Sequence, residues 1–114
     1  MPYLNLDDHF AEHPKVDALS AGAFRLHVSG LCYCAMNLTD GHVEERRVSR
    51  LMPDYSKAYL CELIEAAMWI ERPGGYEIHD YLDWNKSREW WIAKREADNK
   101  RVAAFRARKP KEAS

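Results

Sequence analysis

The sequence predicts a mainly α fold that carries one small β-hairpin. Stretches with apolar residues at helical spacing lie between residues 20 and 68. Two short β-prone runs follow, Trp69 to Glu71 and Tyr76 to Ile78, and they flank a turn at Pro73-Gly74-Gly75. A charged helical pattern then begins near Asn85. This order is that of a winged helix-turn-helix domain followed by a C-terminal basic helix.

The length of the chain, 114 residues, is that of one domain and leaves no room for a second, catalytic one. We expect a winged-helix domain over residues 1–85, a basic helix over 86–108 and a disordered tail over 109–114. No apolar run approaches the roughly 18 residues of a membrane span, and the acidic first residues lack the features of a signal peptide. The sequence therefore predicts a cytoplasmic protein without a membrane partner.

The first long helix is predicted to begin after Ser20, a candidate N-cap. Before this helix, residues 1–15 are predicted to form an irregular N-terminal segment with one helical turn, because Pro14 interrupts any helix there. Thr39-Asp40-Gly41 ends the helical pattern. The apolar positions that recur at helical spacing within it are Phe24, Val28, Leu31, Ala35 and Leu38.

Two further helices are predicted before the hairpin. His42-Val43 first offers a third, edge strand for the hairpin. A short helix follows, with Val48 and Leu51 facing inward, and Pro53 ends it. Ser56 then caps a helix of about three and a half turns, whose apolar stripe consists of Tyr59, Leu60, Leu63, Ile64, Ala67 and Met68.

The hairpin and the last helix are expected to be anchored by aromatic side chains. Trp69 and Tyr76 should lie near one another across the two strands and hold the hairpin to the helices. The last helix has cap candidates in Asn85 and Ser87. Only its first turns are predicted to be anchored in the core, by the tryptophans at 90 and 91, so the second half should project into solvent. A platform on which bases stack is the alternative role of this pair.

Charge is distributed unevenly along the chain. Residues 1–85 contain 7 Lys and Arg and 14 Asp and Glu, whereas residues 86–114 contain 10 and 4. A basic segment of net charge +6 on an acidic body of net charge −7 favours an arm that binds a polyanion. Docking of the arm on its own acidic body, or an idle solvated helix, are the alternatives. A homodimer through Val102 and Phe105 stays open as well.

Candidate nucleic-acid ligands fall into two groups. Lys57 and Tyr59 could read bases at the start of the third helix, although Glu62 and Glu65 on the same helix disfavour insertion into a groove. Glu–Arg pairs on a solvated face are the alternative role for the arginines near residue 46. The candidate phosphate ligands are Arg46, Arg47, Arg50, Arg72, Lys94, Arg95, Lys100, Arg101, Arg106, Arg108, Lys109 and Lys111.

The sequence predicts neither an enzyme nor a cofactor or metal site. It contains no Gly-rich phosphate loop, no nucleophile elbow and no metal-ligand pattern. Cys32 and Cys34 would point about 200° apart on a helix and could not share an ion, while Cys61 makes the cysteine count odd. His79 and Asp80 are adjacent in a predicted strand, so we expect them to face opposite ways rather than converge on a pocket.

Several segments resemble one protein family. They are “HPKVDALSAGAFRLHVSGLCYC” at 13–34, “LTDGHV” at 38–43, “RRVSRLM” at 46–52 and, above all, “GGYEIHDYLDWNKSR” at 74–88 before a basic helix. Together they resemble small winged-helix proteins of actinobacterial phages and prophages, similar to the N-terminal domains of phage replication initiators, or replisome organisers. The resemblance covers nearly the whole chain. It implies binding to double-stranded DNA and a role in phage DNA replication or its regulation, in the cytoplasm of the bacterial host.

A different class of function is also compatible with these patterns. The same fold could serve as a non-enzymatic interaction module that binds a host or phage replication or regulatory protein without specific DNA binding. The charge distribution favours this alternative, because an acidic body repels phosphate everywhere except at the arm.

Overall fold

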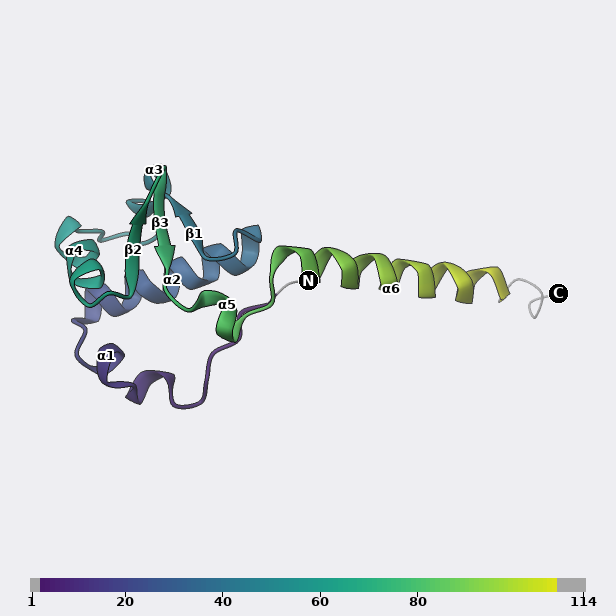
Figure 1. Cartoon of the computed structure of the whole chain (residues 1–114), viewed down its shortest axis with the longest axis horizontal. Coiled ribbons are helices and arrows are strands. Elements are labelled where there is room, and N and C mark those ends of the chain that lie inside the picture. Colours follow the sequence, from purple (N-terminus) through teal and green to yellow (C-terminus); the bar gives the residue numbers. More distant parts are fainter. Residues whose placement is uncertain (1–2, 109–114) are drawn as a thin grey trace.

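The chain folds into a mainly helical body with a small antiparallel sheet, and one long helix extends from that body (Figure 1). The computed structural model describes residues 3–108, so the predicted tail at 109–114, with Lys109 and Lys111, lies outside the described residues. The elements in chain order are η1 (Phe10–Glu12), α1 (Pro14–Asp17), α2 (Ala21–Asn37), β1 (His42–Glu44), α3 (Glu45–Val48), α4 (Lys57–Glu65), β2 (Trp69–Arg72), β3 (Gly75–Ile78), α5 (Tyr81–Trp84) and α6 (Arg88–Arg108).

Helix α2 begins where the sequence predicts. The Ser20 hydroxyl accepts a hydrogen bond from the Ala23 N–H at 3.2 Å, which confirms Ser20 as the N-cap. The helix ends at Asn37, and Leu38 follows in the left-handed region with φ 53°. The buried face differs from the predicted stripe: Phe24, Val28 and Leu38 are only half-buried. The buried residues of α2 are Ala23, Leu26, His27, Gly30, Leu31, Cys34 and Ala35.

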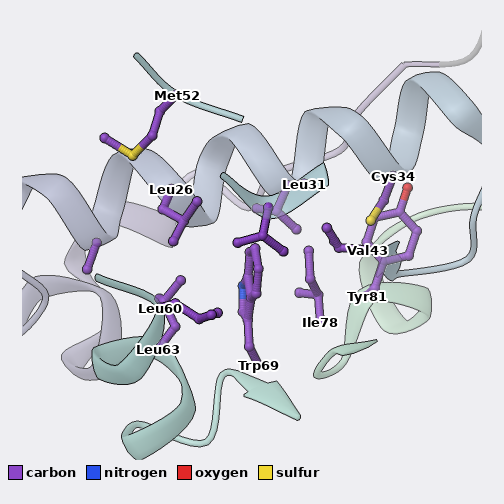
Figure 2. Packing of buried hydrophobic residues seen from close by; sticks show 12 residues of the cluster. Leu26, Leu31, Cys34, Val43, Met52, Leu60, Leu63, Trp69, Ile78 and Tyr81 are labelled. Atoms are coloured by element: carbon purple, nitrogen blue, oxygen red, sulfur yellow. The ribbon is translucent and has the colours of Figure 1, made fainter. Parts of the chain in front are cut away.

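Trp69 explains this shift of the buried face. Its side chain is 1% exposed and stands against α2, between Leu63 of α4 and Ile78 of β3 (Figure 2). A Cβ atom on Gly30 would lie 2.5 Å from Trp69 Cζ2, so the indole fits only where α2 has no side chain. The indole Nε1 also donates a hydrogen bond to His27 Nδ1 at 3.0 Å. The face of α2 that meets the indole is therefore built around a glycine and a histidine, residues that a search for apolar periodicity does not count.

The sheet confirms the predicted hairpin and its third strand. Strand β3 lies in the centre and pairs antiparallel with β1 and with β2. Trp69 and Tyr76 lie diagonally across the hairpin, with ring centroids 6.3 Å apart, as predicted. Gly75 is required at the start of β3, because a Cβ atom there would collide with the Val43 carbonyl oxygen of β1.

Helices α3 and α4 are shorter than predicted. Helix α3 is a single turn that ends at Val48, well before Pro53, although Val48 is buried as expected. Helix α4 is capped by Ser56 but ends at Glu65, about one turn early. Ala67 has φ 59°, and the N–H groups of Ala67 and Met68 bond back to the carbonyls of Ile64 and Leu63, which closes the helix in a Schellman turn. Ala67 is exposed, so its predicted place in the apolar stripe is wrong.

The N-terminal segment is more ordered than predicted. Pro14 begins a helix rather than interrupting one. It occupies the first turn of α1, where a backbone N–H would have no partner within the helix, so its absence costs nothing. Phe10 of η1 stacks on His27, with ring centroids 5.8 Å apart. The Asn5 N–H donates to Asn85 Oδ1 at 2.7 Å, which ties the segment to the chain just before α6.

Helix α6 leaves the body at its first turn and continues along the long axis of the molecule, which measures 65 × 31 × 24 Å (Figure 1). Ser87 caps it, but Asn85 instead follows the last residue of α5, a short helix that the sequence did not predict. The prediction that the two tryptophans are core anchors is wrong. Trp90 is 39% exposed, and Trp91 packs edge-on against Tyr3 at 5.2 Å, outside the buried cluster of the body.

Candidate nucleic-acid interface

The predicted ligands of nucleic acid lie on three separate parts of the molecule. Lys57 and Tyr59 belong to α4, at the opposite end of the long axis from α6 (Figure 1). Arg46, Arg47, Arg50 and Arg72 lie on or beside α3 and at the end of β2. The remaining cations, Lys94, Arg95, Lys100, Arg101, Arg106 and Arg108, are all on α6. The structure therefore does not bring them together into one surface.

The arginines near α3 are balanced by glutamates. The Glu45 N–H donates to the Gly74 carbonyl at 3.0 Å, which joins α3 to the turn of the hairpin. Arg46 Nε lies 2.8 Å from Glu44 Oε2, and Arg72 Nη2 lies 3.0 Å from Glu77 Oε2. The four arginines here are matched by the acidic residues Glu44, Glu45, Glu71 and Glu77. This end of the molecule thus carries no excess of positive charge.

Helix α4 presents a small surface without an excess of positive charge. The Tyr59 ring packs against Gly22 of α2, where any Cβ atom would collide with it, so Tyr59 serves the contact between these two helices. Glu62 turns to α2 as well: its carboxylate accepts from the N–H and the hydroxyl of Ser20, both at 2.7 Å. The exposed residues of α4 are Lys57, Ala58, Cys61 and Glu65.

Most cations of α6 share one side of the helix. At 3.6 residues per turn, the exposed side chains of Arg88, Lys94, Arg95, Arg101 and Arg106 fall within an arc of roughly 140°. Lys100 lies on the opposite side, among alanines and Glu96. The side chain of Arg108, the last residue of α6, lies outside the described part of the structure.

One acidic residue lies within this basic arc. Asp98 is 3.1 Å from Lys94 Nζ and 2.8 Å from Arg101 Nη2. The pKa of Asp98 is lowered from its ordinary value, mainly by the hydrogen bond from Lys94. Asp98 is therefore ionised at neutral pH. Among the side chains that the structure describes, no salt bridge joins α6 to the acidic body, and those of Arg95 and Arg106 make none at all. The arm is thus not neutralised by its own domain.

The start of α6 contains features that the sequence did not indicate. The Asp40 carboxylate accepts a hydrogen bond from the Arg88 N–H at 2.6 Å and so fixes the first turn of α6 to the body. Lys86 lies 5.2 Å above the Trp90 ring. Arg88 itself was not predicted as a ligand, although its spacing of 7 residues from Arg95 is a helical repeat that could have revealed it.

His79 and Asp80 meet rather than diverge, contrary to prediction. His79 Nε2 lies 3.2 Å from Asp80 Oδ2, and both residues line the same cavity. The expected alternation fails because β3 ends at Ile78 and Asp80 has φ 61°, which turns its side chain back. Cys32 and Cys34 do lie on different faces of α2, one exposed and one buried, and burial raises the pKa of Cys34 to about 11.

The described residues contain no group of three or more His, Cys, Asp or Glu side chains placed to hold a metal ion. None of the helices they form is long and apolar enough to cross a bilayer. Comparisons with protein-family models, with curated proteins and with solved structures gave no match to this chain. The charge and geometry described above are therefore the basis on which a function can be assigned.

Proposed function

We propose that this chain is a phage-type DNA-binding protein of the winged-helix class that acts in phage DNA replication or its regulation. Helices α2, α3 and α4, with β1 before α3 and a hairpin after α4, follow the order of a winged helix-turn-helix, in which the hairpin is the wing. The resemblance of “GGYEIHDYLDWNKSR” to phage replication proteins supports the biological role. The observation that carries the proposal is the basic arc of α6, which the acidic body does not neutralise.

The geometry favours α6 as the element that contacts phosphate. Its 21 residues extend over about 30 Å, a length along which duplex DNA presents many phosphates. The acidic body repels DNA, so contact is confined to the arm. Because Lys57 is the sole cation among the exposed residues of α4, we propose that binding depends mainly on phosphate contacts and only weakly on base sequence.

A pair of single substitutions on α6 tests the proposal. Arg95→Ala and Lys100→Ala each remove one exposed cation from the same helix, but from opposite sides. We expect Arg95→Ala to weaken binding to a duplex of 30 base pairs by roughly tenfold at low salt, because a charge-assisted contact to phosphate is lost. Lys100→Ala should change the affinity by less than about threefold. Fluorescence anisotropy with a labelled duplex measures both dissociation constants.

A third variant predicts a change of opposite sign. Asp98→Ala removes the acidic residue of the basic arc and releases Lys94 and Arg101, so it should tighten binding. Equal effects of Arg95→Ala and Lys100→Ala would show that only net charge matters and would refute a defined binding face. No measurable binding of the intact chain at low salt would refute the proposal as a whole.

The exposed apolar residues of α6 favour a second candidate function, the interaction module without specific DNA binding. Ile92 is 41% exposed and Val102 44% exposed, and contact with phosphate uses neither side chain. A replication or regulatory protein of the phage or its host could cover them. If this function is correct, Ile92→Ser should abolish binding to that protein in a pull-down while Arg95→Ala leaves DNA binding unchanged.

A further inference from the structure

A cavity of about 520 Å³ lies between the N-terminal segment and the body, away from α6. Its apolar wall includes Val16, Leu31 and Ile78, with Phe10 and Met68 beside them. This volume is within the range of roughly 300 to 1,000 Å³ found for small-molecule sites. The hydrogen bond from Asn5 to Asn85 holds the outer wall in place, so the cavity exists in the folded chain without a partner.

His27 supplies a polar group at this apolar wall. The residue is 5% exposed and lines the cavity. Its Nδ1 accepts the hydrogen bond of the Trp69 indole, and an indole N–H can only donate, so Nδ1 carries no proton. Burial lowers the pKa of His27 to about 4, which leaves the ring neutral at pH 7 with its proton on Nε2.

The Nε2–H group of His27 is a donor without an acceptor in the protein. Among the side chains that the structure describes, the His27 ring makes one hydrogen bond, to Trp69, and Nε2 is not sealed inside the core. Phe10 stacks on one face of the ring at 5.8 Å and keeps its orientation fixed. A donor at the wall of an apolar cavity contributes to binding when a ligand supplies the acceptor.

We propose that this cavity binds a neutral, largely apolar small molecule that carries one hydrogen-bond acceptor, such as an aromatic ketone, and that the acceptor receives the His27 Nε2–H. Three carboxylates, Asp7, Glu12 and Asp80, line the same cavity against one lysine, Lys15, so the net charge of the lining disfavours an anionic ligand. The site is independent of DNA binding by α6.

Titration with the neutral fluorescent ketone PRODAN tests the site in the intact chain. We expect saturable binding of one molecule per chain, a shift of its emission to the blue, and shifts of the amide resonances of Leu31 and Ile78 in NMR spectra. The anionic dye ANS should bind at least tenfold more weakly. Non-saturable PRODAN fluorescence without amide shifts at these residues would overturn the proposal. The experiment uses the unaltered chain, so a misfolded variant cannot cause this outcome.

Two matched substitutions locate the ligand. Met68→Trp places a bulkier side chain at the cavity, whereas Met36→Trp makes the same change at a residue of α2 that is 75% exposed and does not line it. We expect Met68→Trp to weaken PRODAN binding at least tenfold and Met36→Trp to leave it unchanged. Equal affinities in the two variants, each shown to be folded by circular dichroism, would overturn the site.

A pair of competitors tests the role of His27. Acetophenone and ethylbenzene have similar size and shape, but only the ketone accepts a hydrogen bond. Ethylbenzene is the more hydrophobic of the two, so each affinity is compared with the free energy of transfer of that compound from water to an apolar solvent. Because a hydrogen bond contributes a net factor of several-fold to affinity, acetophenone should bind about fivefold more tightly, relative to ethylbenzene, than this transfer predicts. No such excess for acetophenone would show that Nε2 takes no part in binding.

Discussion

The contact between Trp69 and α2 shows how single residues position the helices of the body. A fully buried indole needs both space and a hydrogen-bond acceptor. Gly30 provides the space and His27 provides the acceptor, and both are on the same face of α2. These two contacts join Trp69, at the start of the hairpin, to the longest helix of the body. The sheet and α2 therefore have one defined relative position (Figure 2).

The fit of Trp69 on Gly30 predicts the effect of Gly30→Ala. Helix propensity alone would stabilise the protein by about 1 kcal/mol. However, the new methyl group would lie 2.5 Å from Trp69 Cζ2, in a place where the rigid ring cannot move aside. We expect a net loss of roughly 1 to 2 kcal/mol in the free energy of unfolding, measured by urea denaturation. Ser29→Ala is the control, and an increase in stability for Gly30→Ala would contradict the packing described here.

The buried His27 predicts a loss of stability in acid. Its pKa is about 4 in the folded chain and 6.5 in the unfolded chain, so below pH 6.5 the unfolded state binds a proton that the folded state does not. The free energy of unfolding should therefore fall as pH falls, by about 2 kcal/mol from pH 7 to pH 5. Urea denaturation at the two pH values measures this loss. The variant His27→Gln should lose much less, and an equal loss would rule out His27 as the cause.

At the scale of the elements, the hairpin and the capped starts of α2, α4 and α6 could be predicted, but the C-terminal ends of α3 and α4 could not. Pro73, Gly74 and Gly75 between two β-prone runs are a strong local signal, and the observed turn agrees with it. The end of α4 gives no such signal, because Ala67 takes the left-handed position where glycine is usual. The two tryptophans at the start of α6 indicate an apolar contact there. They do not show that α6 leaves the body at its first turn, so that this contact lies outside the core.

The link between Asp40 and α6 predicts how firmly the arm is attached. Asp40 has φ 56°, so Asp40→Gly keeps the backbone unstrained while it removes the acceptor of the Arg88 N–H. We expect the Arg88 amide to exchange its hydrogen roughly fivefold faster, since a cap contributes about 1 kcal/mol. Asp80→Gly, at a second aspartate with positive φ, is the matched control. Unchanged exchange at Arg88 would show that Asp40 does not hold the helix.

At the scale of the whole molecule, acidic body and basic arm are separated in space as well as in sequence (Figure 1). The charge count alone predicts the arm, and the structure places most of the cations that it describes there on one side of a helix. The alternative of Glu–Arg pairs near residue 46 agrees with the contact between Arg46 and Glu44, whereas the sequence could not show that Arg72 pairs with Glu77 or that Tyr59 packs on Gly22. Those facts depend on which segments meet in three dimensions, so α6 becomes the principal candidate for contact with DNA.

The dependence of DNA affinity on salt tests this central claim most directly. Anisotropy titrations at several salt concentrations would compare the intact chain with a chain truncated after Ser87. If roughly six to eight phosphates are contacted, the logarithm of the association constant should fall with the logarithm of salt concentration at a slope of about −5 to −7. Truncation should remove most of the slope together with the affinity. A slope near zero for the intact chain, or an unchanged slope after truncation, would contradict the assignment of α6 as the DNA-binding arm.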